Sequence, residues 1–105
     1  MKDIKDNILE KTKVEVNAKT REPPMYRVVL HNDDYTLKEF VVELLVHLFH
    51  KSSAEATELM CRVHREERGV AGIYPREIAE SKVETGITLA RENGFPLQLS
   101  MEPDT

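Results

Sequence analysis

The sequence has little of what marks secreted, membrane-spanning and disulfide-stabilised proteins. It holds one cysteine, Cys61, so no disulfide can form within the chain. Its N-terminal region has no apolar core of the kind found in signal peptides, and no run approaches the ~20 apolar residues that a membrane span needs. A reducing compartment is the simplest environment for such a chain, so we expect a cytoplasmic location.

An excess of basic residues, which a nucleic-acid-binding surface normally needs, is also missing. The formal net charge is −4 at pH 7. Residues 23–105 carry nine Lys or Arg side chains against fourteen Asp or Glu side chains, a net charge of −5. We therefore expect no nucleic-acid partner.

The 105 residues fit one domain preceded by a short extension. Residues 1–24 are polar, contain no aromatic side chain and end in Pro23 and Pro24, so we expect a flexible N-terminal extension. Residues 25–105 are expected to form the core domain. A domain of this size buries well over half of the surface of its unfolded chain, so it can fold without a disulfide or a structural metal.

Hydrophobic periodicity predicts six elements within the core domain. Apolar side chains alternate over residues 25–32, 69–74 and 97–101, which is typical of strands. They recur at helical spacing over residues 36–50, in a segment that opens at residue 52, and over residues 75–92. The order strand, helix, helix, strand, helix, strand predicts an α+β fold, in which a small three-stranded antiparallel sheet is covered on one side by three helices.

Capping residues support the three predicted helices. Thr36 is followed three residues later by Glu39, which matches a capping box with Thr36 as N-cap, and residues 52–55 match a second box. Pro75 suits the first position of the last helix. Asn93 and Gly94 supply its C-terminal stop.

Asn32, Asp33 and Asp34 form a polar cluster between the first predicted strand and the first predicted helix. Asn and Asp commonly turn the chain by accepting hydrogen bonds from nearby backbone, and acids suit the N-terminal end of a helix. With Thr36 as the cap, however, three further polar groups exceed what a turn needs. The cluster therefore has two interpretations, a solvated turn or a ligand site.

Motifs for catalysis or metal binding are scarce. There is no Gly-rich phosphate loop, nucleophile elbow or zinc-ligand spacing. Cys61 and His64, three residues apart, could pair as a thiol nucleophile, although a lone cysteine beside an apolar stripe is more often a buried packing residue. A metal site is a further alternative, with a spacing that matches no known ligand pattern, from His31, Asp33, Asp34 and His64. We therefore expect that the protein is not an enzyme and that it binds neither a cofactor nor a metal.

Three motifs resemble the ClpS family, adaptor proteins that deliver N-degron substrates to Clp proteases. The motifs are Tyr-x-Val-x-Leu-x-Asn-Asp-Asp-Tyr-Thr over residues 26–36, Met60-x-x-Val63-His64, and Ala-Glu-x-Lys over residues 79–82. They occur in the family's order and spacing, and the resemblance runs from about residue 23 to residue 99. It implies the fold predicted above, with a mobile N-terminal tail.

The resemblance also implies a site that binds the first residue of proteins whose N-terminus is Leu, Phe, Tyr or Trp. Asn32, Asp33 and His64 would receive the α-amino group. Asp34 and Thr36 would shape the turn and contact the peptide backbone. An apolar pocket for the side chain of the bound residue would be lined by Leu30, Lys38, Val41, Met60, Val63 and Leu97.

Lys38 departs from the family pattern, which commonly has Met at this position, lining the pocket mouth and rejecting β-branched residues. The methylene stem of Lys38 could lie along the rim with its ammonium in water. Alternatively, Lys38 could open the entrance or repel the ammonium of the ligand. We expect altered selectivity for the first residue of the substrate.

The resemblance implies two kinds of partner for a chain that we expect to be monomeric: N-degron substrate proteins and a Clp ATPase. Glu77 and Lys82 match family positions that dock on the N-terminal domain of a ClpA-like or ClpC-like ATPase, and the N-terminal tail would be what the unfoldase engages. The alternative from another class is a structural interaction domain without affinity for free N-termini, since the C-terminal domain of the ribosomal stalk protein has a related topology.

Overall fold

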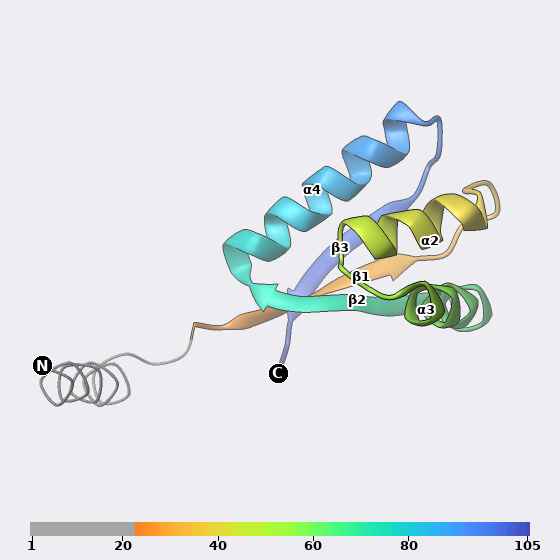
Figure 1. Ribbon diagram of the computed structural model, residues 1–105. Helices are drawn as coiled ribbons and strands as arrows, with labels where there is room; N and C mark the ends of the chain where they lie inside the picture. Colours follow the sequence, from red (N-terminus) through yellow and green to blue (C-terminus); the bar gives the residue numbers. More distant parts are fainter. Residues whose placement is uncertain (1–22) are drawn as a thin grey trace, which may run out of the picture.

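A computed structural model describes residues 23–105 of the chain, and the predicted extension lies almost wholly outside the described residues. The described part consists of six elements (Figure 1), in the order β1 (Met25–His31), α2 (Lys38–His47), α3 (Ser53–Glu66), β2 (Arg68–Pro75), α4 (Arg76–Glu92) and β3 (Gln98–Pro103). This is the predicted order, and the predicted fold class is confirmed. No helix among residues 23–105 is long and apolar enough to cross a membrane.

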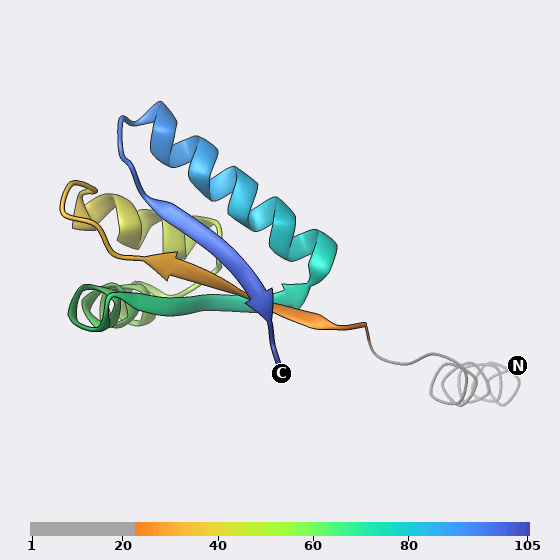
Figure 2. The same cartoon turned by 180° about the vertical axis from the view of Figure 1, so that it is seen from behind.

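The sheet has β1 at its centre, in the strand order β2-β1-β3, and both pairings are antiparallel. Leu30 of β1 lies opposite Gly69 of β2 and Leu99 of β3. The helices lie on one face of the sheet and leave the other face open, as the front and rear views show together (Figures 1 and 2). Because β1 is central, the chain that leaves its C-terminal end emerges beside both edge strands.

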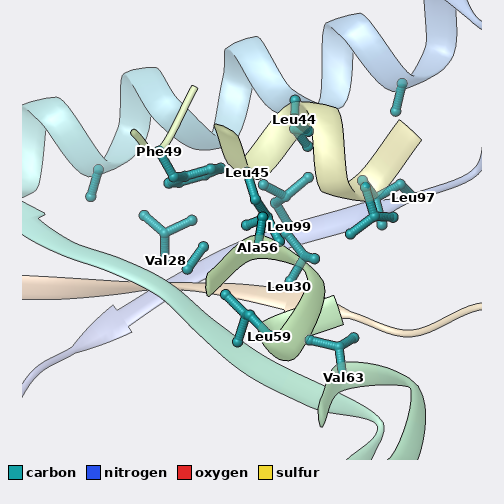
Figure 3. Close-up of a cluster of buried hydrophobic side chains, with 14 residues drawn as sticks. Val28, Leu30, Leu44, Leu45, Phe49, Ala56, Leu59, Val63, Leu97 and Leu99 are labelled. Atoms are coloured by element: carbon teal, nitrogen blue, oxygen red, sulfur yellow. The ribbon is translucent and has the colours of Figure 1, made fainter. Parts of the chain in front are cut away.

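One hydrophobic core fills the space between the sheet and the helices (Figure 3). Val28 and Leu30 of β1 belong to this core, and Val29 between them is also fully buried, although it lies outside the cluster. Leu45 of α2 and Ala56 of α3 are both fully buried. Fully burying a Leu or Val side chain stabilises a fold by roughly 1.5–3 kcal/mol, so this core is the main source of stability.

Helix α4 packs closely on the sheet because of a glycine that the sequence analysis did not single out. A Cβ atom at Gly86 would lie 2.9 Å from Leu99 Cδ2 and 3.5 Å from Leu48 Cδ2. The predicted stop after this helix is confirmed, since Asn93 is the C-cap and Gly94 adopts φ +78°. Such a left-handed backbone is accessible to glycine at little cost.

The capping box predicted at residues 52–55 is confirmed, but the one at residue 36 is wrong. Ser52 Oγ accepts from Glu55 N at 3.1 Å, and Ser52 N donates to Glu55 Oε1 at 3.0 Å. By contrast, α2 begins at Lys38, and its N-cap is Leu37, which makes no side-chain capping bond. The hydroxyl of Thr36 donates instead to Asp33 Oδ2 at 2.7 Å and so is not used as a cap.

Three smaller predictions are also corrected. Helix α2 ends at His47, earlier than residue 50, because His50 turns the chain toward α3 with φ +55°. Pro75 is the N-cap of α4 rather than its first helical residue, since it also ends β2 and keeps an extended ψ of 154°. Cys61 is exposed rather than buried, because α3 directs Leu59 and Val63 toward the core.

Lys82 ties α4 to the end of α2. Its Nζ atom donates to the carbonyl oxygen of Leu48, the C-cap of α2, at 2.7 Å. The same ammonium lies 5.6 Å from the centroid of the Tyr74 ring. A cation at a helix C-terminus interacts favourably with the helix dipole and satisfies a terminal carbonyl. Half-buried Lys82 therefore links α2, β2 and α4.

We expect Lys82→Met to lower the free energy of unfolding by about 1–2 kcal/mol, because it removes a charge-assisted hydrogen bond while keeping an apolar stem. Urea denaturation measures the change. Arg76→Met is the matched control on the same helix, since it removes only the exposed ion pair with Glu80 and should cost about 0.3–0.5 kcal/mol. Equal losses in the two variants would contradict a structural role for Lys82.

Candidate functional site

A cavity of about 160 Å³ opens beyond the C-terminal end of β1, between the loop that leads to α2 and helix α3. For comparison, an engineered protein cavity of about 150 Å³ accommodates benzene. The cavity contains all eleven residues assigned above to amino-group, backbone or pocket roles, and one more residue, His31. Its lining comprises Leu30, His31, Asn32, Asp33, Asp34, Thr36, Lys38, Val41, Met60, Val63, His64 and Leu97.

The apolar walls of the cavity belong to the hydrophobic core. Leu30, Val41, Val63 and Leu97 are all buried members of the core cluster, and Met60 packs against that cluster. They come from β1, α2, α3 and the segment before β3. Figure 3 shows Val63 and Leu97 toward one end of the core, with Leu30 nearer its middle. Side chains held by core packing cannot collapse readily into the cavity, so the cavity is a stable feature of the fold.

Asp33 builds the turn on the polar side of the cavity. Its Oδ1 atom accepts from Tyr35 N at 2.8 Å and from Thr36 N at 2.7 Å, and its Oδ2 atom accepts from Thr36 Oγ1 at 2.7 Å. This is the Asx-turn geometry that the sequence suggested as one interpretation. A carboxylate can accept about four hydrogen bonds, so three internal donors leave Oδ2 able to accept one more.

The pKa of Asp33 is lowered from its ordinary value of 3.8. Desolvation is the largest single contribution and raises the pKa, but it is outweighed by hydrogen bonds from the Thr36 hydroxyl and from the backbone of Thr36 and Tyr35. The positive charge of Arg91 lowers the pKa further. Each of these donors and charges favours the ionised carboxyl, so Asp33 carries its negative charge at neutral pH.

Asn32 is held by Glu67, a residue that the sequence analysis did not identify. Asn32 N donates to the Glu67 carbonyl oxygen at 2.8 Å, and Asn32 Nδ2 lies 3.5 Å from Glu67 Oε2. Glu67 is the C-cap of α3 and adopts the left-handed φ of +74°. A glutamate at a position that suits glycine gives no sequence signal, because patterns of residue type do not reveal φ.

The remaining polar side chains lie at the mouth of the cavity. Asp34, Lys38 and His64 are exposed there. Within residues 23–105, no hydrogen bond engages the imidazole of His64 or the Oδ1 atom of Asn32. The mouth therefore presents free acceptors beside one ammonium group, that of Lys38.

Glu77 and Lys82, the pair assigned to docking, lie outside this cavity. They belong to α4, which begins at the opposite end of the sheet from the loop between β1 and α2 (Figure 1). Glu77 is exposed, whereas Lys82 is half-buried against Leu48 and Tyr74. Residue type alone does not reveal this difference in burial between Glu77 and Lys82.

The two alternative interpretations, a thiol nucleophile at Cys61 and a metal site, involve residues that the structure only partly brings together. Within residues 23–105, no group of three or more His, Cys, Asp or Glu side chains could hold a metal ion. Cys61 is exposed and does not line the cavity, although His64 does. The position of His64 therefore suits a hydrogen bond to a ligand in the cavity better than activation of Cys61 as a nucleophile.

The lowered pKa of Asp33 predicts a specific acid sensitivity. A carboxyl whose pKa is lower in the folded state contributes stability above its unfolded pKa and loses it as the pH falls through the folded pKa. We therefore expect the wild type to lose stability below about pH 4, and Asp33→Asn to show a flatter dependence over this range. Thr36→Val, which removes one of three donors, should be intermediate.

Urea denaturation at a series of pH values between 5 and the acid limit of folding measures this effect. Parallel curves for the wild type and Asp33→Asn would contradict the proposed source of the acid sensitivity.

Comparisons with known proteins agree on one family. The family model described as "ATP-dependent Clp protease adaptor protein ClpS" matches residues 21–100. Among similar proteins, the ATP-dependent Clp protease adapter protein ClpS of Desulforapulum autotrophicum is 50% identical over 98 residues, which cover 93% of this chain and 94% of the relative. That of Desulfotalea psychrophila is 55% identical over 88 residues, 84% of this chain and 86% of the relative.

A solved structure shares the fold. The structure of Agrobacterium tumefaciens ClpS2 bound to L-phenylalaninamide matches with a TM-score of 0.76 and 38% sequence identity. The match covers 79% of this chain and 100% of the other. With the family model, the relatives and the structure in agreement, the chain belongs to the ClpS family of Clp protease adaptor proteins.

Proposed function

We propose that this protein is a non-catalytic adaptor that binds proteins with Leu, Phe, Tyr or Trp as their first residue and delivers them to a Clp ATPase. The observation that carries the proposal is a cavity of about 160 Å³ with apolar core side chains on its walls and free acceptors at its mouth. L-phenylalaninamide, which the A. tumefaciens relative binds, has a bulky apolar side chain that would suit such walls and a free α-amino group that would suit such acceptors.

The polar mouth suits an α-amino group. Such a group has an ordinary pKa of about 8, so it is mostly a cation at neutral pH. Asn32 Oδ1, the remaining acceptor site of Asp33 and the His64 imidazole are the groups proposed to accept from its N–H groups. Hydrogen bonds that involve a charged partner contribute roughly 1.5–3 kcal/mol each. An acetylated N-terminus has lost the charge and most of these donors.

The apolar walls suit the side chain of the first residue. Leu30, Val41, Val63 and Leu97 are fixed by the core, so the protein does not have to order them when a ligand binds. Burial of a Leu or Phe side chain among them stabilises the complex by roughly 1.5–3 kcal/mol. The size of the cavity, close to one that accommodates benzene, is compatible with bulky side chains.

Docking on the N-terminal domain of a ClpA-like or ClpC-like ATPase is proposed for the region around Glu77 and Lys82. Exposed Glu77 is available for an intermolecular contact. Lys82 already donates to Leu48 O, so a docking role must compete with or share this bond. The proposals that the unfoldase engages residues 1–24, that the chain is monomeric and that it is cytoplasmic are based on the sequence.

Fluorescence anisotropy with a Leu-started peptide and its N-acetylated twin tests the binding proposal. We expect the wild type to bind the free peptide and to bind the acetylated one at least about tenfold more weakly, the lower end of the value of one charge-assisted bond. Equal affinity for the two peptides would refute recognition of the α-amino group and would favour the structural interaction domain.

Asp33→Asn tests the role of the Asp33 charge more specifically than Asp33→Ala does. An Asn side chain can still accept from Tyr35 N and Thr36 N, so the turn is kept while the charge is lost. We expect this variant to lose about tenfold or more in affinity for the free peptide. Glu84→Gln, which removes an exposed carboxylate of α4 outside the cavity lining, is the control and should bind like the wild type.

Lys38 is expected to relax selectivity for the first residue. It lines the cavity and is exposed, so its stem provides a mobile rim rather than a fixed apolar wall. On a peptide array over all twenty first residues, we expect the wild type to bind Ile- and Val-started peptides. Lys38→Met should lower their binding relative to Leu by about tenfold. An unchanged ratio of Ile to Leu binding would show that Lys38 does not control the entrance.

A further inference from the structure

We infer that Glu67 is a positioning residue for the α-amino site, one that fixes the amide of Asn32 so that its oxygen faces the ligand. This inference rests on the proposed function, because it concerns how the same site is prepared for a cation. Glu67 does not line the cavity. Its effect on a ligand would therefore be transmitted through Asn32.

The contacts between the two residues separate into a backbone part and a side-chain part. Asn32 N donates to Glu67 O at 2.8 Å, a bond that any residue at position 67 could accept. Asn32 Nδ2 donates to Glu67 Oε2 over a long 3.5 Å, and this contact needs the carboxylate. The backbone bond joins the end of α3 to the end of β1, while the side-chain contact acts only on the orientation of the amide.

The orientation matters because an ammonium group can only donate hydrogen bonds. With Nδ2 toward the Glu67 carboxylate, Oδ1 is directed away from it and accepts no hydrogen bond within residues 23–105. A reversed amide would set Oδ1 against the carboxylate, acceptor against acceptor. It would also present Nδ2, a donor, to an incoming ammonium. Glu67 therefore favours the one orientation of Asn32 that can bind a cation.

The backbone conformation at position 67 would suit glycine better than glutamate, which indicates that the Glu67 side chain has a role apart from forming the turn. Glu67 adopts φ +74° between α3 and β2. Glycine adopts this conformation without the steric penalty that a Cβ atom brings, and it would keep the carbonyl that Asn32 N uses. What glycine could not provide is the carboxylate beside Asn32.

Glu67→Gly makes stability and binding move in opposite directions if the inference is right. The variant should have a higher melting temperature than the wild type, because the left-handed strain is removed. Its affinity for a Leu-started peptide should fall about three- to tenfold, the value of one modest hydrogen bond. A loss of binding in a more stable protein is not explained by damage to the fold. Glu67→Asn, which tolerates the same φ but is shorter, should lose affinity similarly.

Two controls separate positioning from a general loss of negative charge. Glu66→Ala removes the neighbouring carboxylate, which makes no hydrogen bond to Asn32, and should leave affinity within about twofold. In an Asn32→Ala background, Glu67→Gly should have no further effect on affinity, because residues that act through one another are not additive. Both measurements use the same peptide and the full chain.

The outcomes distinguish this inference from the proposed function. If the wild type fails to discriminate the free peptide from its acetylated twin, the proposed function is wrong and this inference fails with it. If the wild type discriminates but Glu67→Gly and Glu67→Asn bind like the wild type, only the role of Glu67 is wrong. If Glu67→Gly lowers affinity by the same factor in the Asn32→Ala variant as in the wild type, the inference is also overturned, since Glu67 would then act by a route other than Asn32.

Discussion

The carboxylate of Asp33 is the interaction on which the site depends. It accepts two backbone N–H groups and the Thr36 hydroxyl, and so closes the loop by which the chain passes from β1 to α2. This loop brings the start of α2 near the end of α3, and the cavity lies between them. The same carboxylate keeps one acceptor site, so the group that shapes the mouth of the cavity is also able to bind there. Turn and ligand site, which the sequence offered as alternatives, are compatible in one side chain.

The apolar half of the site shows a similar sharing of roles. Leu30, Val63 and Leu97 support the fold as core residues and form the walls of the cavity. A pocket built from core side chains is rigid because its walls are held from behind by close packing. Such a pocket selects by shape at little ordering cost on binding. Selectivity should then depend most on residues at the mouth that the core does not hold, and exposed Lys38 is one of these.

The sequence was sufficient for the order of the strands and helices and for eleven of the twelve residues that line the cavity, but for different reasons. The strands and helices follow from the spacing of apolar residues, which burial enforces directly, and Leu30, Leu45 and Leu99 illustrate this rule. The residues of the cavity came from family motifs, since Asn32 and His64 are 32 positions apart and no local pattern joins them. Fold and site were thus predictable where either periodicity or motif spacing carried the information.

Some details could not be predicted from residue type, because they depend on which groups meet in the folded chain. Thr36 has the right spacing for a helix cap, but its hydroxyl donates to Asp33 instead, so the predicted cap is wrong. The family resemblance assigned Lys82 to docking, and its residue type did not reveal that its ammonium lies 2.7 Å from Leu48 O at the end of α2. Glu67 has an unusual φ that its residue type conceals. In each case a contact between segments or a backbone angle, rather than residue type, determines what the side chain does.

The stoichiometry of donors and acceptors links these contacts to the proposed ligand. An α-ammonium group presents three N–H donors. Among the acceptors at the mouth, the proposal assigns three to this group: Asn32 Oδ1, one acceptor site on Asp33 and a ring nitrogen of His64. Internal contacts arrange two of these three acceptors: Glu67 holds Nδ2 of Asn32, and Thr36 with Tyr35 takes the other acceptor sites of Asp33. A neutral amide offers one donor and would leave two of these acceptors without a partner. The proposed discrimination against blocked N-termini would therefore depend on contacts that the protein makes within itself, before any ligand binds.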